Sequence, residues 1–107
     1  MAVRKTIEEV VVVDGDRATW LARSESALHR QGFTRVSANG ALYQVEANYK
    51  KEKVWGTLQV TLLPSGDSST AITMQATANV DNIYALFASP GRKIITRFKE
   101  GLHADVT

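Results

Sequence analysis

An alternation of apolar and polar side chains in three segments between residues 41 and 80 constrains the fold more than any other feature of the sequence. A period of two residues is typical of β-strands that bury one face. The apolar positions are odd-numbered in the first segment and even-numbered in the next two: Ala41, Tyr43, Val45, Ala47 and Tyr49; Val54, Gly56, Leu58, Val60 and Leu62; Ile72, Met74, Ala76, Ala78 and Val80. The pattern predicts three consecutive strands that share one apolar face.

The turn residues between the segments predict how the strands pair. Asn39-Gly40 is a strong signal for a two-residue hairpin turn. Such a turn places Ala38 opposite Ala41 and Val36 opposite Tyr43, so a further strand precedes the alternating region. Register matters because a slip of one residue would turn every side chain to the other face.

The registers of the other two hairpins follow from whether each loop has an even or an odd number of residues. The change from odd to even positions requires an even loop, which Lys51-Glu52 or Lys50–Lys53 supplies. This loop predicts Tyr49 opposite Val54 and Val45 opposite Leu58. The last hairpin joins two even-numbered sets and requires an odd loop. Gly66-Asp67-Ser68 provides it, with Leu62 opposite Ile72 and Leu58 opposite Ala76.

The segments before the alternating region predict a strand followed by a helix. Residues 6–13 are rich in β-branched side chains, which favour a strand. Asp14 or Asp16 can cap the next helix by accepting free backbone N–H groups. An amphipathic helix is expected over residues 17–31, ending at Gly32 in a left-handed conformation.

The C-terminal segment predicts helix in two pieces. Asp81-Asn82 can start a short turn, and Ser89 followed by Pro90 is typical of the start of a second helix. The second helix is expected to end at about Leu102, leaving 103–107 as a frayed tail. Four apolar side chains form one stripe on this helix: Ile94, Ile95, Phe98 and Leu102.

These elements predict an α+β fold, a two-layer sandwich in which a five-stranded antiparallel sheet carries both helices on one face. The order β-α-β-β-β-β-α resembles that of TBP-like folds and of small Bet v 1/START-type helix-grip domains, over about residues 5–102. The resemblance implies that the first strand pairs with the last. This chain is shorter than full-length helix-grip proteins and has one N-terminal helix where they have two.

Composition and motifs limit the kinds of functional site that the chain can form. The 107 residues fit one domain, with an ordered core of about 5–102. The chain has no cysteine, which excludes disulfides and thiolate sites, and it contains no phosphate-binding loop motif. His29 and His103 stand alone, so neither a metal nor a cofactor is expected. No apolar run approaches the roughly 20 residues of a membrane span. Because the N-terminal residues do not form an export signal, we expect a cytoplasmic protein.

A cluster of aromatic and large apolar side chains predicts a ligand site between the sheet and the C-terminal helix. Phenol groups can orient a small apolar ligand or lipid in such a pocket. The alternative is an ordinary core, in which small residues such as Ala38, Ala41, Ala47, Gly56, Ala76 and Ala78 permit close packing. The predicted ligand-binding residues are Tyr43, Tyr49, Leu58, Met74, Tyr84, Phe87 and Phe98.

The start of the C-terminal helix is a candidate anion site. It combines exposed backbone N–H groups with cations, which suits sulfate or phosphate. The alternative is ordinary helix capping with solvated basic side chains. The residues concerned are Ser89, Gly91, Arg92 and Lys93.

Other functions rank below ligand binding. Trp55, Leu42 and Leu63 point to the outer face of the predicted sheet, where a homodimer or protein partner could dock. Nucleic acid is not expected as a partner, because that face lacks the basic residues and apolar wedges of minor-groove binders. Catalysis ranks last, because only Glu25 and the tyrosines could move protons.

Overall fold

The computed structural model describes residues 3–51, 54–80 and 90–106, and it has the expected order of elements. Strand β1 (Val3–Asp14) leads into helix α1 (Arg17–Arg30), and helix α2 (Pro90–Val106) ends the described chain. Four strands lie between the helices: β2 (Thr34–Asn39), β3 (Gln44–Lys51), β4 (Val54–Ser65) and β5 (Ser69–Val80).

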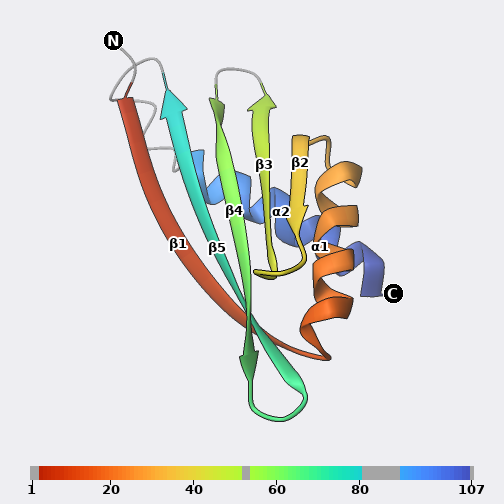
Figure 1. Ribbon diagram of the computed structural model, residues 1–107. Coiled ribbons are helices and arrows are strands. Elements are labelled where there is room, and N and C mark those ends of the chain that lie inside the picture. Colours follow the sequence, from red (N-terminus) through yellow and green to blue (C-terminus); the bar gives the residue numbers. More distant parts are fainter. Residues whose placement is uncertain (1–2, 52–53, 81–89, 107) are drawn as a thin grey trace.

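The strands form one antiparallel sheet in the order β1-β5-β4-β3-β2. The first strand therefore pairs with the last, as the resemblance implied. The sheet is strongly twisted, and both helices lie on the same side of it (Figure 1). We call the helix-covered side the inner face and the opposite side the open face. This arrangement confirms the predicted two-layer α+β sandwich.

A tight corner joins β1 to α1. Gly15 has φ 115° and the N–H of Gly15 donates to Ser68 O at 2.8 Å, which ties the corner to the β4–β5 hairpin. Asp16 is the N-cap, and its Oδ1 accepts from the backbone N of Thr19 at 2.8 Å. Trp20 Nε1 donates to Asp14 O at 2.7 Å. These contacts fix the direction of α1. Of the two aspartates that the sequence offered as caps, Asp16 rather than Asp14 caps the helix.

The alternation predicts the faces of β3, β4 and β5 correctly and the β3–β4 register incorrectly. Leu58 pairs with Ala76 and Leu62 with Ile72, as expected. Between β3 and β4, however, Tyr49 lies opposite Gly56 and Val45 opposite Val60, two residues away from the predicted partners. A shift of two residues leaves every side chain on the same face, so a pattern of period two cannot distinguish the two registers.

The β2–β3 hairpin also differs from prediction. Asn39-Gly40 does not form a two-residue turn, since Asn39 pairs with Gln44 and Ala38 with Val45. Asn39 Oδ1 instead accepts from the backbone N of Ala41 at 3.1 Å and of Leu42 at 3.2 Å. These bonds stabilise a longer turn in which Ala41 is exposed, and Ala38 is exposed as well. Neither alanine belongs to the core.

Helix α2 extends through Val106, beyond the predicted end at about Leu102. The expected short turn at Asp81-Asn82 lies outside the described residues. No helix among the described residues is long and apolar enough to cross a membrane.

The inner face and the two helices together bury the core. Leu58 and Met74 have no exposed surface, which confirms the predicted orientation of β4 and β5. On the open face Leu63 is 49% exposed, as expected, whereas Leu42, also predicted there, lies in the β2–β3 turn and is 60% exposed. The buried hydrophobic residues are Trp20, Ala27, Leu28, Phe33, Val45, Ala47, Leu58, Val60, Leu62, Ile72, Met74, Ala76, Ala78, Ile94, Ile95, Phe98 and Leu102.

Candidate functional site

The two predicted tyrosines lie at opposite ends of β3. Tyr43 precedes the strand, in the β2–β3 turn with φ 51° rather than within a strand as predicted, and the guanidinium carbon of Arg17 lies 3.9 Å from its ring centroid. Tyr49 lies six residues further on, about 20 Å away at the usual rise of a strand. Its ring packs against Phe33 with 5.2 Å between the centroids. The two phenols therefore cannot line one small pocket.

The middle of the inner face is closed. Leu58, Met74 and Phe98 have an exposed fraction of 0%. A void large enough for water would leave accessible surface on the side chains that line it. These three side chains therefore pack as core, and they separate the Tyr43 end from the Tyr49 end.

The second end of the inner face lies around Tyr49, whose side chain, like that of Tyr43, is half-buried. Tyr49 and Trp55 are half-buried there, on opposite faces of the sheet, while Phe33 is almost completely buried. Tyr84 and Phe87, predicted to complete the site, lie outside the described residues. The predicted ligand-binding set is therefore described only in part.

Small residues in this fold bring backbones together. A Cβ built on Gly56 would stand 2.1 Å from Thr77 O, so β5 runs unusually close to β4 there. A Cβ on Gly91 would stand 2.9 Å from Cγ1 of Ile7. Close packing therefore accounts for these glycines, and the small residues at these places do not line a cavity.

The predicted anion site is partly described. Gly91 is buried against β1, whereas Arg92 and Lys93 are exposed on α2. Ser89 lies outside the described residues. The binding of an anion at the start of α2 stays a prediction.

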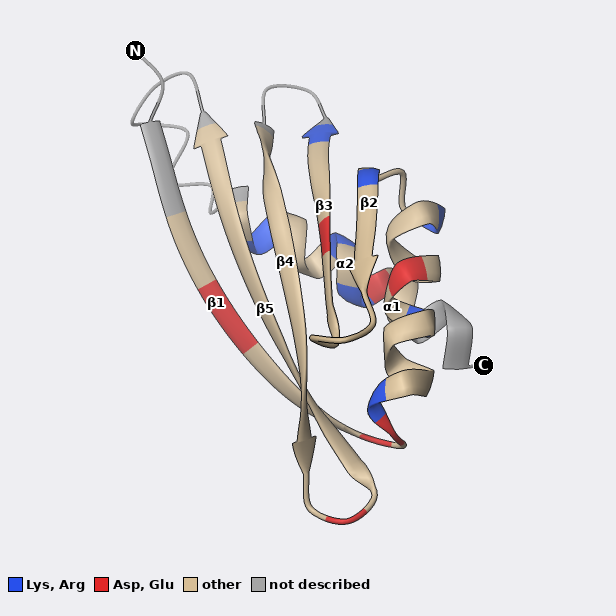
Figure 2. Cartoon of the chain, viewed as in Figure 1, with Lys and Arg blue, Asp and Glu red and all other residues tan. Residues whose placement is uncertain are grey.

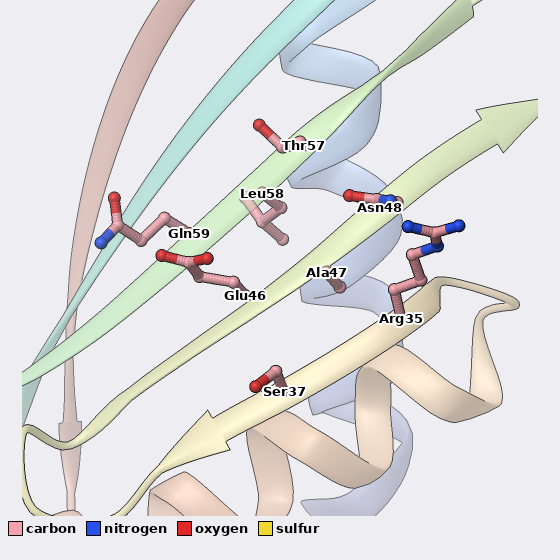
Figure 3. Close-up of a pocket in the computed structure, with 8 residues that line it drawn as sticks. All are labelled: Arg35, Ser37, Glu46, Ala47, Asn48, Thr57, Leu58 and Gln59. Atoms are coloured by element: carbon pink, nitrogen blue, oxygen red, sulfur yellow. The ribbon is translucent and has the colours of Figure 1, made fainter.

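A hollow of about 360 Å³ lies on the open face, where the sequence suggested a surface for a homodimer or protein partner and no small-molecule site. Figure 3 shows its six polar side chains: Arg35, Ser37, Glu46, Asn48, Thr57 and Gln59. Ala47 and Leu58 complete the lining beneath them. A smaller hollow of about 170 Å³ adjoins it, sharing Ser37 and Glu46.

A β-bulge in β2 positions this hollow. The register shifts between Thr34, which pairs with Asn48, and Ser37, which pairs with Glu46. Two residues of β2, Arg35 and Val36, therefore face the single residue Ala47. Arg35 adopts φ 51°, in the left-handed region. The sequence gives no signal of the bulge, because Val36 and Ala38 alternate with polar residues as in a regular strand, yet β2 is exposed at nearly every position.

The other titratable groups form no recognisable catalytic or metal centre within the described residues. No group of three His, Cys, Asp or Glu side chains there is arranged to hold a metal ion. His29 is exposed and Glu25 is half-buried on α1. Hydrogen bonds from Thr19, its hydroxyl first and its backbone N–H second, hold the pKa of the Asp16 carboxyl below its ordinary value. This shift reflects helix capping rather than catalysis.

Several solved structures are similar to this chain. A structure of norcoclaurine synthase from Thalictrum flavum, in complex with a transition-state analogue, superposes with a TM-score of 0.66 at 9% identity, covering 95% of this chain and 93% of that one. A second, in complex with dopamine and hydroxybenzaldehyde, has a TM-score of 0.64 at 10% identity, covering 98% and 87%.

A chain of the adenylate sensor from AMP-activated protein kinase, complexed with ATP, has a TM-score of 0.67 at 14% identity, covering 86% of this chain and 93% of that one. No protein-family model and no curated protein sequence matches the chain. At these identities the similarity shows the fold alone, which is that of a helix-grip-like α+β sandwich.

Proposed function

We propose that this chain is a non-catalytic domain that binds a small apolar ligand between the inner face and α2, at the Tyr49 end. The observation that supports this proposal is that the ring of Tyr49 is half-buried and packs on Phe33, beside a core that is closed elsewhere. An aromatic pair of this kind offers a flat apolar surface and one hydroxyl group, which together can orient a ligand.

The remaining predicted ligand-binding residues have different roles in this proposal. Leu58 and Phe98 are proposed to form the closed floor of the site, whereas Met74 lies in the row of Val45 and Val60, nearer the Tyr43 end, and packs as core. Tyr84 and Phe87, which stand in the connection between β5 and α2, are proposed to complete the lining. Tyr43 is left out, because it lies at the far end of β3 beneath Arg17.

The similar structures support an aromatic group in the ligand. One norcoclaurine synthase structure is a complex with dopamine and hydroxybenzaldehyde, each of which carries an aromatic ring together with polar groups. We propose binding rather than catalysis for this chain because Glu9, a carboxylate on the inner side of β1, is already held by Lys99 Nζ at 2.9 Å.

Titration with the neutral fluorescent probe N-phenyl-1-naphthylamine tests the proposal. We expect the full chain to bind one probe molecule and to melt at a higher temperature when the probe is present. Tyr49→Ala should weaken binding about tenfold or more, a loss of about 1.4 kcal/mol. The matched control is Tyr43→Ala, which removes the same side chain from the other end of the strand and should bind like the parent.

Two results would reject this function. One is the absence of any fluorescence change with the folded parent protein. The other is an equal loss of affinity in Tyr49→Ala and Tyr43→Ala, because a site at the Tyr49 end cannot depend on both. Circular dichroism of each variant shows whether it remains folded.

A further inference from the structure

The hollow on the open face carries two opposite charges that do not pair with each other. Arg35 lies near the Asn48 side of the hollow and Glu46 near the Gln59 side (Figure 3). Among the described residues, neither Arg35 nor Glu46 takes part in an ion pair, and neither side chain forms a hydrogen bond. A guanidinium and a carboxylate thus line the same space with a gap between them.

Few other charges compete for that space. Strands β4 and β5 carry no Lys, Arg, Asp or Glu, and Figure 2 shows both strands uncoloured by charge. Neutral donors and acceptors occupy the neighbouring positions on the open face. Glu46 pairs with Gln59 and Asn48 with Thr57 across β3 and β4. A ligand in the hollow would therefore meet one cation, one anion and several hydrogen-bonding groups.

The conformation of Arg35 adds an independent observation. Its φ of 51° is costly for a residue with a side chain, and glycine or asparagine normally occupies such a position. Turn geometry alone does not require an arginine here. Strained residues of this kind persist where the surrounding structure holds them, and they often mark functional sites.

We propose that the hollow binds a small zwitterion of amino-acid size, with its carboxylate on Arg35 and its ammonium group on Glu46. Guanidinium groups recognise carboxylates through paired hydrogen bonds. Glu46 can accept hydrogen bonds from an ammonium group, while Ser37, Asn48 and Gln59 can bond the remainder of the ligand. A volume of about 360 Å³ is at the lower end for small-molecule sites. The site is independent of the apolar one, because it uses the opposite face of β3.

Two-dimensional NMR titration of the full chain tests this inference. With L-glutamine as the zwitterionic probe, we expect saturable shifts of the backbone amides at 35–37, 46–48 and 57–59. Propionate, which has only the carboxylate, and propylamine, which has only the ammonium group, should each bind about tenfold more weakly or worse. Arg35→Gln and Glu46→Gln should show the same loss for L-glutamine. Arg92→Gln, which neutralises an exposed arginine on α2, should bind like the parent.

Two further variants separate binding from folding. Arg35→Gly permits the left-handed backbone without strain, so it should melt no lower than the parent and still lose L-glutamine binding. A double variant that combines Arg35→Glu with Glu46→Arg should restore binding, with the zwitterion bound in the reverse orientation. N-phenyl-1-naphthylamine should bind the Arg35→Gln variant as it binds the parent.

Three results would overturn the proposal: no amide shifts in the hollow with L-glutamine at high millimolar concentration, equal binding of L-glutamine and propionate, or unchanged L-glutamine affinity in Arg35→Gly.

Discussion

Gly101 of α2 packs directly against Ala27 of α1: a Cβ built on the glycine would lie 3.0 Å from both the Cβ and the carbonyl O of the alanine. The two helices therefore cross with their backbones almost in contact. Arg30 Nη1 strengthens this crossing by donating to Gly101 O at 3.1 Å. The contact explains how two short helices cover one sheet with a closed core between them.

Replacing Gly101 with alanine should destabilise the protein. The new methyl group has no room against Ala27, and overpacking of this kind costs about 1–3 kcal/mol. The higher helix propensity of alanine offsets about 1 kcal/mol of that cost. We expect a net loss of up to about 2 kcal/mol in urea unfolding. Gly40→Ala is the control, because nothing lies within 4 Å of a Cβ there. Equal stability of the two variants would contradict the close helix crossing.

Ser24→Ala should stabilise the protein. Ser24 is completely buried in α1, and its hydroxyl has no hydrogen-bond partner. An unsatisfied buried hydroxyl costs about 1–3 kcal/mol, and alanine removes it and favours helix. We expect a gain of about 1 kcal/mol in the free energy of unfolding. Ser26→Ala, at an exposed position of the same helix, should gain less. A loss of stability in Ser24→Ala would show that the hydroxyl has a partner in solution.

The Asp16 cap predicts a dependence of stability on acid. The folded-state pKa of Asp16 is lowered, so its contribution is present above the unfolded pKa and is lost as the pH falls through the folded pKa. Asparagine caps helices about as well as aspartate and does not titrate in this range. Melting temperatures of Asp16→Asn should therefore fall less than those of the parent between about pH 5 and pH 2. If the melting temperatures of the two proteins fell equally with pH, the Asp16 cap would not be the group whose titration lowers the stability.

The bulge in β2 predicts opposite effects of glycine at neighbouring positions. Arg35→Gly relieves a left-handed strain of about 1–2 kcal/mol, which offsets the about 0.5–1 kcal/mol that glycine costs in a strand. Val36 is half-buried and is not in the left-handed region, so Val36→Gly loses buried surface and gains no relief. Urea unfolding should place Arg35→Gly at or above the parent and Val36→Gly at least about 1 kcal/mol below it. The reverse order would exclude the bulge.

Alternation made the architecture predictable from the sequence. The burial of Leu58 and Met74 and the pairing of Leu62 with Ile72 follow from the period of two and from loop parity. The same period made the β3–β4 register ambiguous by two residues, since Tyr49 faces the core whether it pairs with Val54 or with Gly56. At Asn39 a side chain that accepts two backbone N–H groups displaced the expected tight turn.

The open-face hollow could not be predicted in the same way. It depends on the bulge at Arg35, which is a local departure from the ladder, and no periodicity encodes such a departure. The separation of Tyr43 from Tyr49 was implicit in their spacing of six residues, since a strand of that length spans about 20 Å. The prediction assigned both tyrosines to one site because both are aromatic. Their distance along the chain places them in different parts of the fold.

The central claim is that an apolar ligand occupies the Tyr49 end of the inner face. Intermolecular nuclear Overhauser effects between unlabelled N-phenyl-1-naphthylamine and the isotope-labelled full chain measure this directly. We expect contacts from the probe to the rings of Tyr49 and Phe33 and none to Tyr43. Contacts confined to Tyr43, or to open-face side chains such as Thr57, would contradict the account.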